Sequence, residues 1–498
     1  MLRKLTISNY RSIRSLYCDF REFNVFFGVN NAGKTNIMNA INLVLGESWP
    51  TPNSFEDKDF FGHNIGVPIE ISAFLEPPLN HYAGGHSYEI HGVKLKYDGE
   101  ETEFTCLNED GSQLCYQSRN NYPIRVSREI KEQAGFMFLD LNRLSAQQIK
   151  NSPWTFYGKY LKRIGRNLKP EQKIIFSEKT TEALRELLSD PEISSFVEFV
   201  KDSIHSQTGM STEFSVSPLN PIDSIQGFKP HLHDPLSNLD HEAEDLGAGI
   251  QSALSLAIAR GYSEVTGRRF IFAVEEPELY LHPHAARVFY RHLKALSEQS
   301  VQVIYTTHSK HFVNLNDVVY FKKVSRDGEG TKISSHTTSD MNDLSAFATI
   351  SKYNPQINEI FFGDKIVIAE GPTDEAACRY VLEEVLGFDL DKSNISLSNS
   401  GGGGGLTKVI ENIAWLGPKI YAITDWDRNG VEAQARISCL KSAIGSESVF
   451  VQHPGLERMF SFEGHFDQGN VLREVKSYFD SGNATPEMYE RLHRVLRM

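Results

Sequence analysis

The segment GVNNAGKT, from Gly28 to Thr35, decides how the first part of the chain folds. It matches the pattern G-x-x-x-x-G-K-[ST], and it stands between the strand-like FNVFFG and residues 34–46, where apolar side chains recur at helical spacing. Glycines let backbone N–H groups approach phosphate oxygens, and the start of a helix adds partial positive charge. The segment therefore predicts a nucleotide-binding loop, in which Lys34 neutralises phosphate oxygens and Thr35 holds Mg²⁺. The residues assigned to it are Gly28, Asn30, Asn31, Ala32, Gly33, Lys34, Thr35 and Asn36.

Two carboxylates follow a second apolar strand. The segment RRFIFAVEEPELYLHPH (Arg268–His284) ends its apolar run on Glu275 and Glu276. Glu275 is placed to support the Mg²⁺ shell, and Glu276 to orient or deprotonate an attacking water. The alternative is an ordinary strand–loop junction that carries acids. A third apolar strand, VQVIYTT, is followed by His308, which taken alone is also consistent with a hydrogen-bonded structural residue.

A further group of acids lies in the last part of the chain. The strand-like IVIAEG delivers Glu370, and PKIYAITDWDRNG delivers Asp425 and Asp427 in a D-x-D pattern. Neighbouring strands of a parallel sheet would bring these three carboxylates together at its carboxyl edge, where hard oxygen ligands select Mg²⁺ or Mn²⁺. The alternative is a set of solvated acids at the edge of a doubly wound sheet.

Four segments together resemble one class of ATPase. The loop at Gly28, LGAGIQSALSLAIA (Leu246–Ala259), AVEEPELYLHP and THS resemble the ATPases of the recombination-repair and chromosome-maintenance branch of the ABC superfamily. The resemblance implies ATP as the cofactor, a catalytic role for Glu276 and a γ-phosphate sensor at His308. It also implies a signature loop that contacts ATP held by a second protomer, so that the chain forms at least a transient homodimer.

Two assignments depend on looser matches to that class. The usual signature is Ser-Gly-Gly, whereas this chain has Gly247-Ala248-Gly249, and Gly247 and Gly249 are assigned to the nucleotide. Small residues that open a helix can still place its N-terminus at a phosphate. Arg11 in ISNYRSI matches a position near the nucleotide in these ATPases, although a surface or salt-bridged arginine is equally consistent with the sequence.

The acids of the last part resemble a nuclease site. Glu-Gly followed by D-x-D is similar to the Toprim domain of topoisomerases, primases and certain nucleases. The order of ABC-type ATPase and then Toprim resembles the OLD (overcoming lysogenization defect) family of ATP-dependent endonucleases. The resemblance implies that Glu370, Asp374, Asp425 and Asp427 bind two divalent metals, which activate water and stabilise the leaving 3′ oxygen. Glu457 is a candidate further ligand.

Three features leave alternatives open. Nucleases of this family use a basic residue downstream of the D-x-D, for which Lys441, Arg458 and Lys476 are all candidates. The run Gly401–Gly405 is either a phosphate-approaching loop at a helix start or a flexible link. An apolar stripe in the helical residues 171–207 is either intramolecular core or a dimerisation arm.

The expected fold class is α/β: an ABC-type P-loop ATPase with a helical dimerisation insert, followed by a Rossmann-like Toprim domain. We expect residues 1–165 to form the N-terminal part of the ATPase with the P-loop, and residues 166–210 the helical insert. Residues 211–362 are expected to carry the signature, the second acidic strand (Walker B) and the His switch. Residues 363–498 are expected to form the Toprim nuclease domain with a helical C-terminus.

Composition restricts location and partners. The formal net charge of −13 excludes a global basic field, so contact with nucleic acid must use local basic patches or bound cations. The five cysteines are scattered and the N-terminus lacks the apolar core of a signal peptide, which predicts a cytoplasmic protein. No run approaches the roughly 18 apolar residues needed to span a bilayer, so no membrane contact is expected.

These features predict an ATP-binding and hydrolysing DNA endonuclease that requires Mg²⁺ or Mn²⁺ and is gated by an ABC-type ATPase dimer. Family resemblance implies prokaryotic anti-phage defence, and leaves room for a partner protein or nucleic acid of a defence system. Two alternatives do not cut DNA: an ATP-sensing scaffold that binds a partner or toxin, and a repair ATPase that clamps DNA. Retention of the metal-binding acids favours the endonuclease.

Overall fold

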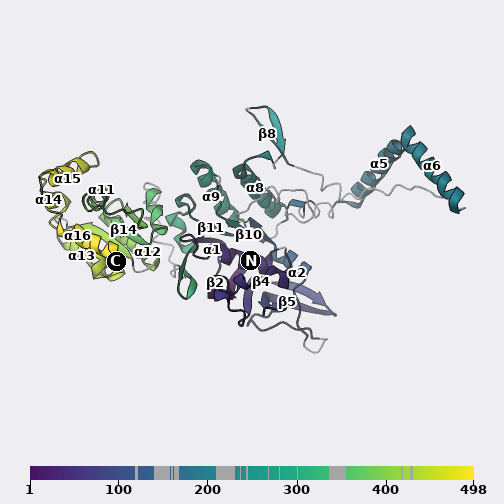
Figure 1. The fold of residues 1–498 in the computed structure, drawn as a ribbon, viewed down its shortest axis with the longest axis horizontal. Helices are drawn as coiled ribbons and strands as arrows, with labels where there is room; N and C mark the ends of the chain where they lie inside the picture. The colour runs from purple at the N-terminus through teal and green to yellow at the C-terminus, as the bar shows by residue number, and fades with distance from the viewer. Residues whose placement is uncertain are drawn as a thin grey trace. The chain divides into compact units, whose positions relative to one another are not determined.

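The computed structural model describes most of the chain (Figure 1). Two compact units are present, one formed by Met1–Asp140 with Arg268–Met498 and the other by Leu141–Gly267. Every helix in the described part of the chain is too short or too polar to cross a membrane. The described residues are 1–46, 48–117, 122–139, 157–158, 161, 168–208, 230–235, 237–242, 245–266, 269–279, 281–299, 301–335, 355–416, 419–426 and 430–498.

A six-stranded sheet carries the predicted nucleotide loop. Its strands lie in the order β13-β12-β3-β11-β10-β7, and all neighbours except β12 and β13 are parallel. The strands β3, β10 and β11 are buried along their whole length, as expected for apolar parallel strands covered on both faces. The bounds are β3 Phe23–Phe27, β7 Phe136–Leu139, β10 Phe270–Glu275, α9 Pro283–Ser297, β11 Val301–Thr307, β12 Phe321–Asp327 and β13 Gly330–Ser335.

Helix α1 (Lys34–Leu45) shares one apolar core with this sheet and with a five-stranded antiparallel sheet. Ile37, Met38, Ile41 and Val44 of α1 are fully buried in that core, which confirms the helical spacing expected from sequence. The antiparallel strands lie in the order β2-β1-β4-β5-β6. Their bounds, with the short helix that follows them, are β1 Leu2–Tyr10, β2 Ile13–Asp19, β4 Ile69–Ala83, β5 His86–Tyr97, β6 Thr102–Leu107 and α2 Arg128–Ala134.

The C-terminal part of the same unit is a four-stranded, wholly parallel sheet in the order β15-β14-β16-β17. Helices alternate with these strands, so the carboxyl ends of all four strands lie at one edge. This confirms the expected α/β class. The bounds are β14 Lys365–Ala369, α11 Pro372–Tyr380, β15 Ile395–Asn399, α12 Gly403–Ile413, β16 Ile420–Asp425, α13 Gly430–Ile444, β17 Val449–Gln452, α14 Leu456–Met459, α15 Val471–Asp480 and α16 Glu487–Arg497.

The second unit contains α5 (Pro170–Leu188) and α6 (Pro191–Thr208), which meet at an angle (Figure 1). The apolar stripe expected from sequence lies on α6, where Phe196 is 62% and Phe199 73% exposed. These two side chains are therefore not packed as intramolecular core, and a role in dimerisation stays a prediction. The remaining elements of the unit are β8 His231–Asp234, β9 Leu239–Glu242 and α8 Ala248–Thr266.

Candidate functional site

The loop between β3 and α1 encloses its own lysine. Lys34 Nζ donates hydrogen bonds to the carbonyl oxygens of Gly28 and Val29, each at 3.0 Å. Burial lowers the pKa of Lys34 to about 8, although the nearby carboxylates act in the opposite direction. An ammonium group held by loop carbonyls can exchange them for phosphate oxygens, which form stronger, charge-assisted hydrogen bonds.

Two glycines of the loop are required by backbone shape and by close packing. Gly28 and Gly33 have φ angles of 150° and 109°, and a Cβ at Gly33 would collide with the hydroxyl groups of Ser12 and Thr331. These hydroxyls lie 2.7 Å apart, and Thr331 Oγ1 donates to the carbonyl oxygen of Ala32 at 2.9 Å. The β12–β13 hairpin therefore supports the loop directly.

The other predicted residues of this site divide between support and access. Asn36 Nδ2 donates to Ser12 Oγ at 2.7 Å, so this side chain supports the loop. Thr35 is exposed, which leaves its hydroxyl accessible to a cation. Arg11 forms an ion pair with Asp59 at 2.7 Å. The structure thus has Arg11 in the salt-bridged state, and its contact with nucleotide stays a prediction.

The two Walker B acids lie at the end of β10. Glu275 is only 2% exposed, and the backbone N–H of Glu276 donates to the carbonyl oxygen of Thr306 in β11 at 3.0 Å. Glu276 Oε1 lies 3.3 Å from His308 Nε2. Burial, reinforced by the charge of Lys34, lowers the pKa of His308 to about 4. The imidazole is therefore neutral at pH 7 and can hydrogen-bond at this position without carrying charge.

Glu278 holds the segment around His308 that follows β11, which we call the histidine loop. The sequence patterns do not indicate this role. Glu278 Oε1 accepts hydrogen bonds from Thr307 Oγ1 and from the backbone N–H of His308, both at 2.7 Å. Burial raises the pKa of Glu278. The signal in the sequence is its position two residues after Glu276, which becomes informative only once β10 and β11 are known to be neighbours.

The signature segment is described within its own unit. Gly247 immediately precedes α8, and Gly249 lies in its first turn. Gln251 Nε2 donates to the carbonyl oxygen of Leu246 at 2.8 Å, which ties this helix start together. The contact of Gly247 and Gly249 with a nucleotide on another protomer stays a prediction.

The carboxyl edge of the C-terminal sheet collects three of the four predicted acids. Glu370 follows β14 and Asp425 ends the neighbouring strand β16. Glu370 Oε2 accepts hydrogen bonds from Thr424 Oγ1 at 2.7 Å and from the backbone N–H of Asp425 at 3.0 Å. Arg436 of α13 forms an ion pair with the same oxygen at 3.2 Å. The fourth acid, Asp427, lies outside the described residues.

A buried glutamine joins the remaining two acids. Gln452 ends β17, and its backbone is the register partner of Asp425. In the amide orientation that satisfies its neighbours, Gln452 Nε2 donates to Asp374 Oδ1 and to Asp425 Oδ1, both at 2.7 Å. Asp374 lies in the first turn of α11, where its Oδ2 accepts from the backbone N–H of Gly371 at 2.9 Å. Asp425 Oδ1 also accepts from the backbone N–H of Leu456 at 3.0 Å.

The ionised forms of Asp374 and Asp425 are electrostatically unfavourable. Burial, then the charges of Asp374 and Glu370, raise the pKa of Asp425 to about 8. Burial, then the charge of Glu370, raises the pKa of Asp374 to about 7. Glu457 acts on both in the same direction, and it is itself held by His465 at 2.8 Å. Such a group is stabilised by protons or by a cation.

The donor set fits a hard divalent cation. All the acids at this edge offer carboxylate oxygens, the ligands that Mg²⁺ and Mn²⁺ prefer. Within the described residues, no three His, Cys, Asp or Glu side chains are arranged to enclose an ion. Asp427 is outside that set, so the fit rests on the chemistry of the buried Asp374 and the half-buried Asp425 rather than on a closed coordination shell.

A cation should therefore stabilise the protein more at high pH than at low pH. The folded-state pKa values of Asp374 and Asp425 are about 7 and about 8, above the ordinary value of 3.8. The free energy of unfolding therefore falls as pH rises from the ordinary value to these folded-state values. We expect Mn²⁺ to raise Tm more at pH 8.5 than at pH 6. Each kcal/mol that the cation adds to the free energy of unfolding corresponds to a rise in Tm of about 2–4 °C. Asp425→Asn should remove much of the difference. Thermal unfolding in EDTA and in Mn²⁺ tests this, and an equal cation response at both pH values contradicts it.

The basic residues considered from sequence are all on the surface. Lys441, Arg458 and Lys476 are exposed, whereas Arg436 contacts Glu370 and also donates to the carbonyl oxygen of Asp425 at 2.9 Å. The sequence patterns did not indicate Arg436. Its position in the helix that follows the D-x-D is the signal that could identify it.

The glycine run begins a helix beside the first acid. The backbone N–H of Gly402 donates to the carbonyl oxygen of Glu370 at 2.7 Å, and α12 starts at Gly403. Gly402 has a φ of 137°, which favours glycine there. This part of the run is an ordered helix start, and its approach to a phosphate stays a prediction.

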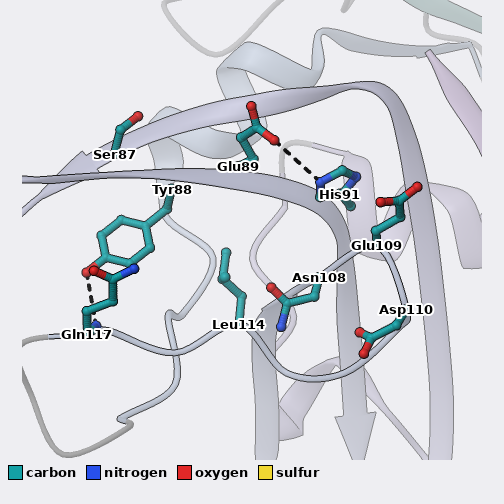
Figure 2. A pocket seen from close by; sticks show the side chains of 9 residues that line it. All are labelled: Ser87, Tyr88, Glu89, His91, Asn108, Glu109, Asp110, Leu114 and Gln117. Atoms are coloured by element: carbon teal, nitrogen blue, oxygen red, sulfur yellow. Dashed lines mark hydrogen bonds and ion pairs between the residues drawn. The ribbon is translucent and has the colours of Figure 1, made fainter.

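A pocket on the antiparallel sheet lies apart from these residues. Figure 2 shows its lining, which comes from β5 and from the segment after β6 and includes none of the predicted site residues. Glu89 and His91 approach within 3.8 Å there. The side chains that line this pocket belong neither to the group around the β3–α1 loop nor to the group of acids at the carboxyl edge of the C-terminal sheet.

Comparison with known proteins identifies the two domains that carry these residues. A sequence model of the AAA ATPase domain matches residues 1–74 and 80–313, and one of the overcoming lysogenization defect protein-like TOPRIM domain matches residues 361–427. The chain is 27% identical to an OLD nuclease of Thermus scotoductus over 92% of this chain and 91% of that protein. It is 22% identical to the Old nuclease of Escherichia phage P2, over 86% and 77%. It is also 22% identical to the Endonuclease GajA of Bacillus cereus, over 76% and 67%.

These matches confirm the resemblance to the OLD family that the sequence motifs indicated. The ATPase match ends just beyond His308, and the TOPRIM match runs from the segment before β14 to the D-x-D. The chain therefore belongs to the AAA ATPase domain family, among the members in which an OLD-like TOPRIM domain follows the ATPase domain.

Proposed function

We propose that the chain is an ATP-hydrolysing DNA endonuclease of prokaryotic anti-phage defence, which requires Mg²⁺ or Mn²⁺ and whose cutting is controlled by its ATPase domain. The ATPase and TOPRIM domains supply the two chemistries. The observation that carries the proposal is the group of Glu370, Asp374 and Asp425 at one sheet edge, where a cation would stabilise the buried Asp374 and the half-buried Asp425. Cation-dependent cleavage of plasmid DNA by the purified protein tests it. The defence role rests on likeness to the OLD nucleases.

In the nuclease site, the protein fixes the ligands before a cation binds. Three donors hold Glu370 Oε2, which leaves Oε1 as the oxygen to face a cation. Asp374, Asp425 and Asp427 would complete the ligand set. Bound divalent cations supply an activated water and stabilisation of the leaving oxygen. Arg436 contacts both Glu370 and the end of β16, and it therefore fixes their positions relative to each other.

In the ATP site, Lys34 is proposed to bind the terminal phosphates, with Thr35 and Glu275 holding Mg²⁺. Glu276 orients the attacking water, and the neutral imidazole of His308 lies beside it to sense the γ-phosphate. The charged phosphate oxygens would replace the loop carbonyl oxygens as the hydrogen-bond partners of Lys34.

Aromatic packing supports control of cutting by nucleotide. Phe27 is the last residue of β3, directly before the phosphate loop, and its ring packs edge-on against Trp415 with centroids 6.2 Å apart. Trp415 follows α12, whose start is bonded to the backbone of Glu370. A shift of the phosphate loop can therefore reach the nuclease site through one ring contact and one helix.

A polar connection runs beside it. The segment η8 (Pro355–Phe361) binds the chain just after the histidine loop, because Asn358 Nδ2 donates to the carbonyl oxygen of Val313 at 2.9 Å. On its other side, Ser396 Oγ of β15 donates to the carbonyl oxygen of Glu359 at 2.9 Å. Movement of the γ-phosphate sensor would thus be transmitted to the C-terminal sheet.

Trp415→Ala is expected to uncouple the two activities. ATP hydrolysis and cation-dependent cutting should both persist, but the ratio of cutting rates with and without ATP should move towards one, because the contact with Phe27 is lost. Trp49→Ala, at a tryptophan that is 44% exposed, is the matched control and should keep the parental ratio. Paired rate measurements test this, and an unchanged ratio in Trp415→Ala contradicts the coupling.

A homodimer is part of the proposal. Signature residues Gly247 and Gly249 would act on the nucleotide of a second copy, and the exposed Phe196 and Phe199 offer apolar surface for association. Light scattering with and without ATP tests this: we expect a dimer in ATP for Glu276→Gln, which should retain bound nucleotide. A monomer under those conditions contradicts it.

A further inference from the structure

The side-chain amide of Gln452 lies between two acids of the nuclease site. Its Nε2 has two protons, of which one points at Asp374 Oδ1 and the other at Asp425 Oδ1, with both distances 2.7 Å. Gln452 is 0% exposed, so bulk water does not compete for these acceptors. A neutral donor that serves two carboxylates at once fixes their separation and offsets their repulsion without adding a charge.

The backbone brings this amide into place. Strand β17 pairs in parallel with β16, and the register sets Gln452 opposite Asp425. Asp374 reaches the same point from the first turn of α11, where the backbone N–H of Gly371 holds its other oxygen at 2.9 Å. Three separate segments therefore converge on one amide group.

A tyrosine from the last helix anchors the other end of the amide. Tyr489 of α16 is fully buried and donates its hydroxyl to Gln452 Oε1 at 3.3 Å. When both acids are ionised, as cation binding requires, the opposite orientation would point the amide oxygen at two carboxylates, where it could accept nothing and would be repelled. The two acids thus set the orientation of the amide, and the Tyr489 hydroxyl holds its oxygen in place.

We propose that Gln452 is the positioning residue that sets the spacing of Asp374 and Asp425 for divalent-cation binding, with Tyr489 anchoring its amide oxygen. This inference rests on the proposed function of the site as a cation-dependent nuclease. Gln452 is fully buried and contacts the proposed ligands, so its removal acts first on cation affinity. Asp425 Oδ2 and the second lone pair of Asp374 Oδ1 stay available to the cation.

Gln452→Met tests the proposal, because methionine keeps the length of the side chain and removes both donors. Manganese binding to nucleotide-free, full-length protein is measured by titration calorimetry, and the part that Asp425→Ala abolishes is assigned to this site. We expect Mn²⁺ to bind about 10–100-fold more weakly, as for other residues that orient metal ligands. ATP hydrolysis should be unchanged. Gln434→Met, on the exposed face of α13, is the matched control and should bind Mn²⁺ like the parent.

Tyr489→Phe provides a second variant in case Gln452→Met does not fold, as judged by thermal unfolding in EDTA. Loss of the single hydroxyl bond should weaken Mn²⁺ binding about fivefold. A purely structural role would lower Tm in EDTA and leave the affinity of the folded protein unaltered. Equal affinity in the parent and in the folded variants, including no measurable binding in any of them, overturns the proposal.

The affinity measurement separates this inference from the proposed function. If the parent binds Mn²⁺ at this site and does not cut DNA, the endonuclease proposal fails while weaker binding in Gln452→Met still supports the positioning role. If the parent cuts DNA and Gln452→Met binds Mn²⁺ equally well, the positioning role fails and the endonuclease proposal stands.

Discussion

Asp425→Ala is expected to lower the rate of DNA cutting by about 1,000-fold or more while leaving ATP hydrolysis intact. The carboxylate ends β16 and is bonded to Gln452 and to the backbone N–H of Leu456, so it is held at the sheet edge. Loss of a metal ligand removes several kcal/mol of charge stabilisation in the transition state, and each 1.4 kcal/mol is a factor of ten. Initial rates of plasmid cutting and of phosphate release from ATP measure the two activities separately.

The matched control for this change is Asp480→Ala, at an exposed aspartate at the end of α15. It removes the same charge from the same domain and should cut DNA at the parental rate. Parental cutting by Asp425→Ala would mean that the acids of this edge are not the nuclease site. Loss of ATP hydrolysis in the same variant would mean that the change damages the whole protein.

Lys34→Ala is expected to weaken ATP binding by about 30-fold or more. Lys34 is the buried cation of the loop, and removing one partner of a buried, hydrogen-bonded charge pair costs about 2–5 kcal/mol. Glu276→Gln should differ in kind, because the amide keeps the shape of the site but cannot accept the proton of water. We expect it to bind ATP normally and to hydrolyse it about 10²–10⁴-fold more slowly.

Calorimetric binding of ATP and steady-state release of phosphate separate these outcomes. Asn36 supports the loop through its bond to Ser12, which does not involve Lys34, so a folded Lys34→Ala protein should retain most of the thermal stability of the parent in the absence of nucleotide. Normal turnover in both variants contradicts the assignment of the ATP site. Weak binding in Glu276→Gln would instead move this glutamate from catalysis to nucleotide binding.

The residues that the sequence identified lie at points where local pattern determines position. Lys34 follows a strand and a glycine loop, and the order of these elements alone places it over the loop. Glu370 and Asp425 end apolar strands, and the parallel pairing of β14 with β16 brings both to one edge. The expectation that these two strands pair was enough to predict that Glu370 and Asp425 lie close together.

The residues that the sequence did not identify act through contacts between distant segments. Gln452 meets Asp374 across 78 positions of chain, and Tyr489 lies 37 positions beyond Gln452, in the last helix. Glutamine at the end of the short strand VFVQ resembles any polar strand end until β17 is known to pair with β16. Arg436 similarly lies on an amphipathic helix, where an arginine is usually solvated. Tertiary contact, which no local pattern encodes, gives these side chains their roles.

The central claim is that one chain combines an ATPase with a cation-dependent DNA-cutting site. Incubation of the purified parent protein with supercoiled plasmid in Mn²⁺ or Mg²⁺, beside the same reaction in EDTA, tests this most directly. We expect nicked or linear DNA to accumulate only with the divalent cation, and more steeply at low salt, where contact with phosphates is strongest. Intact plasmid in Mn²⁺ and Mg²⁺, with and without ATP, or equal cutting in EDTA, contradicts the account.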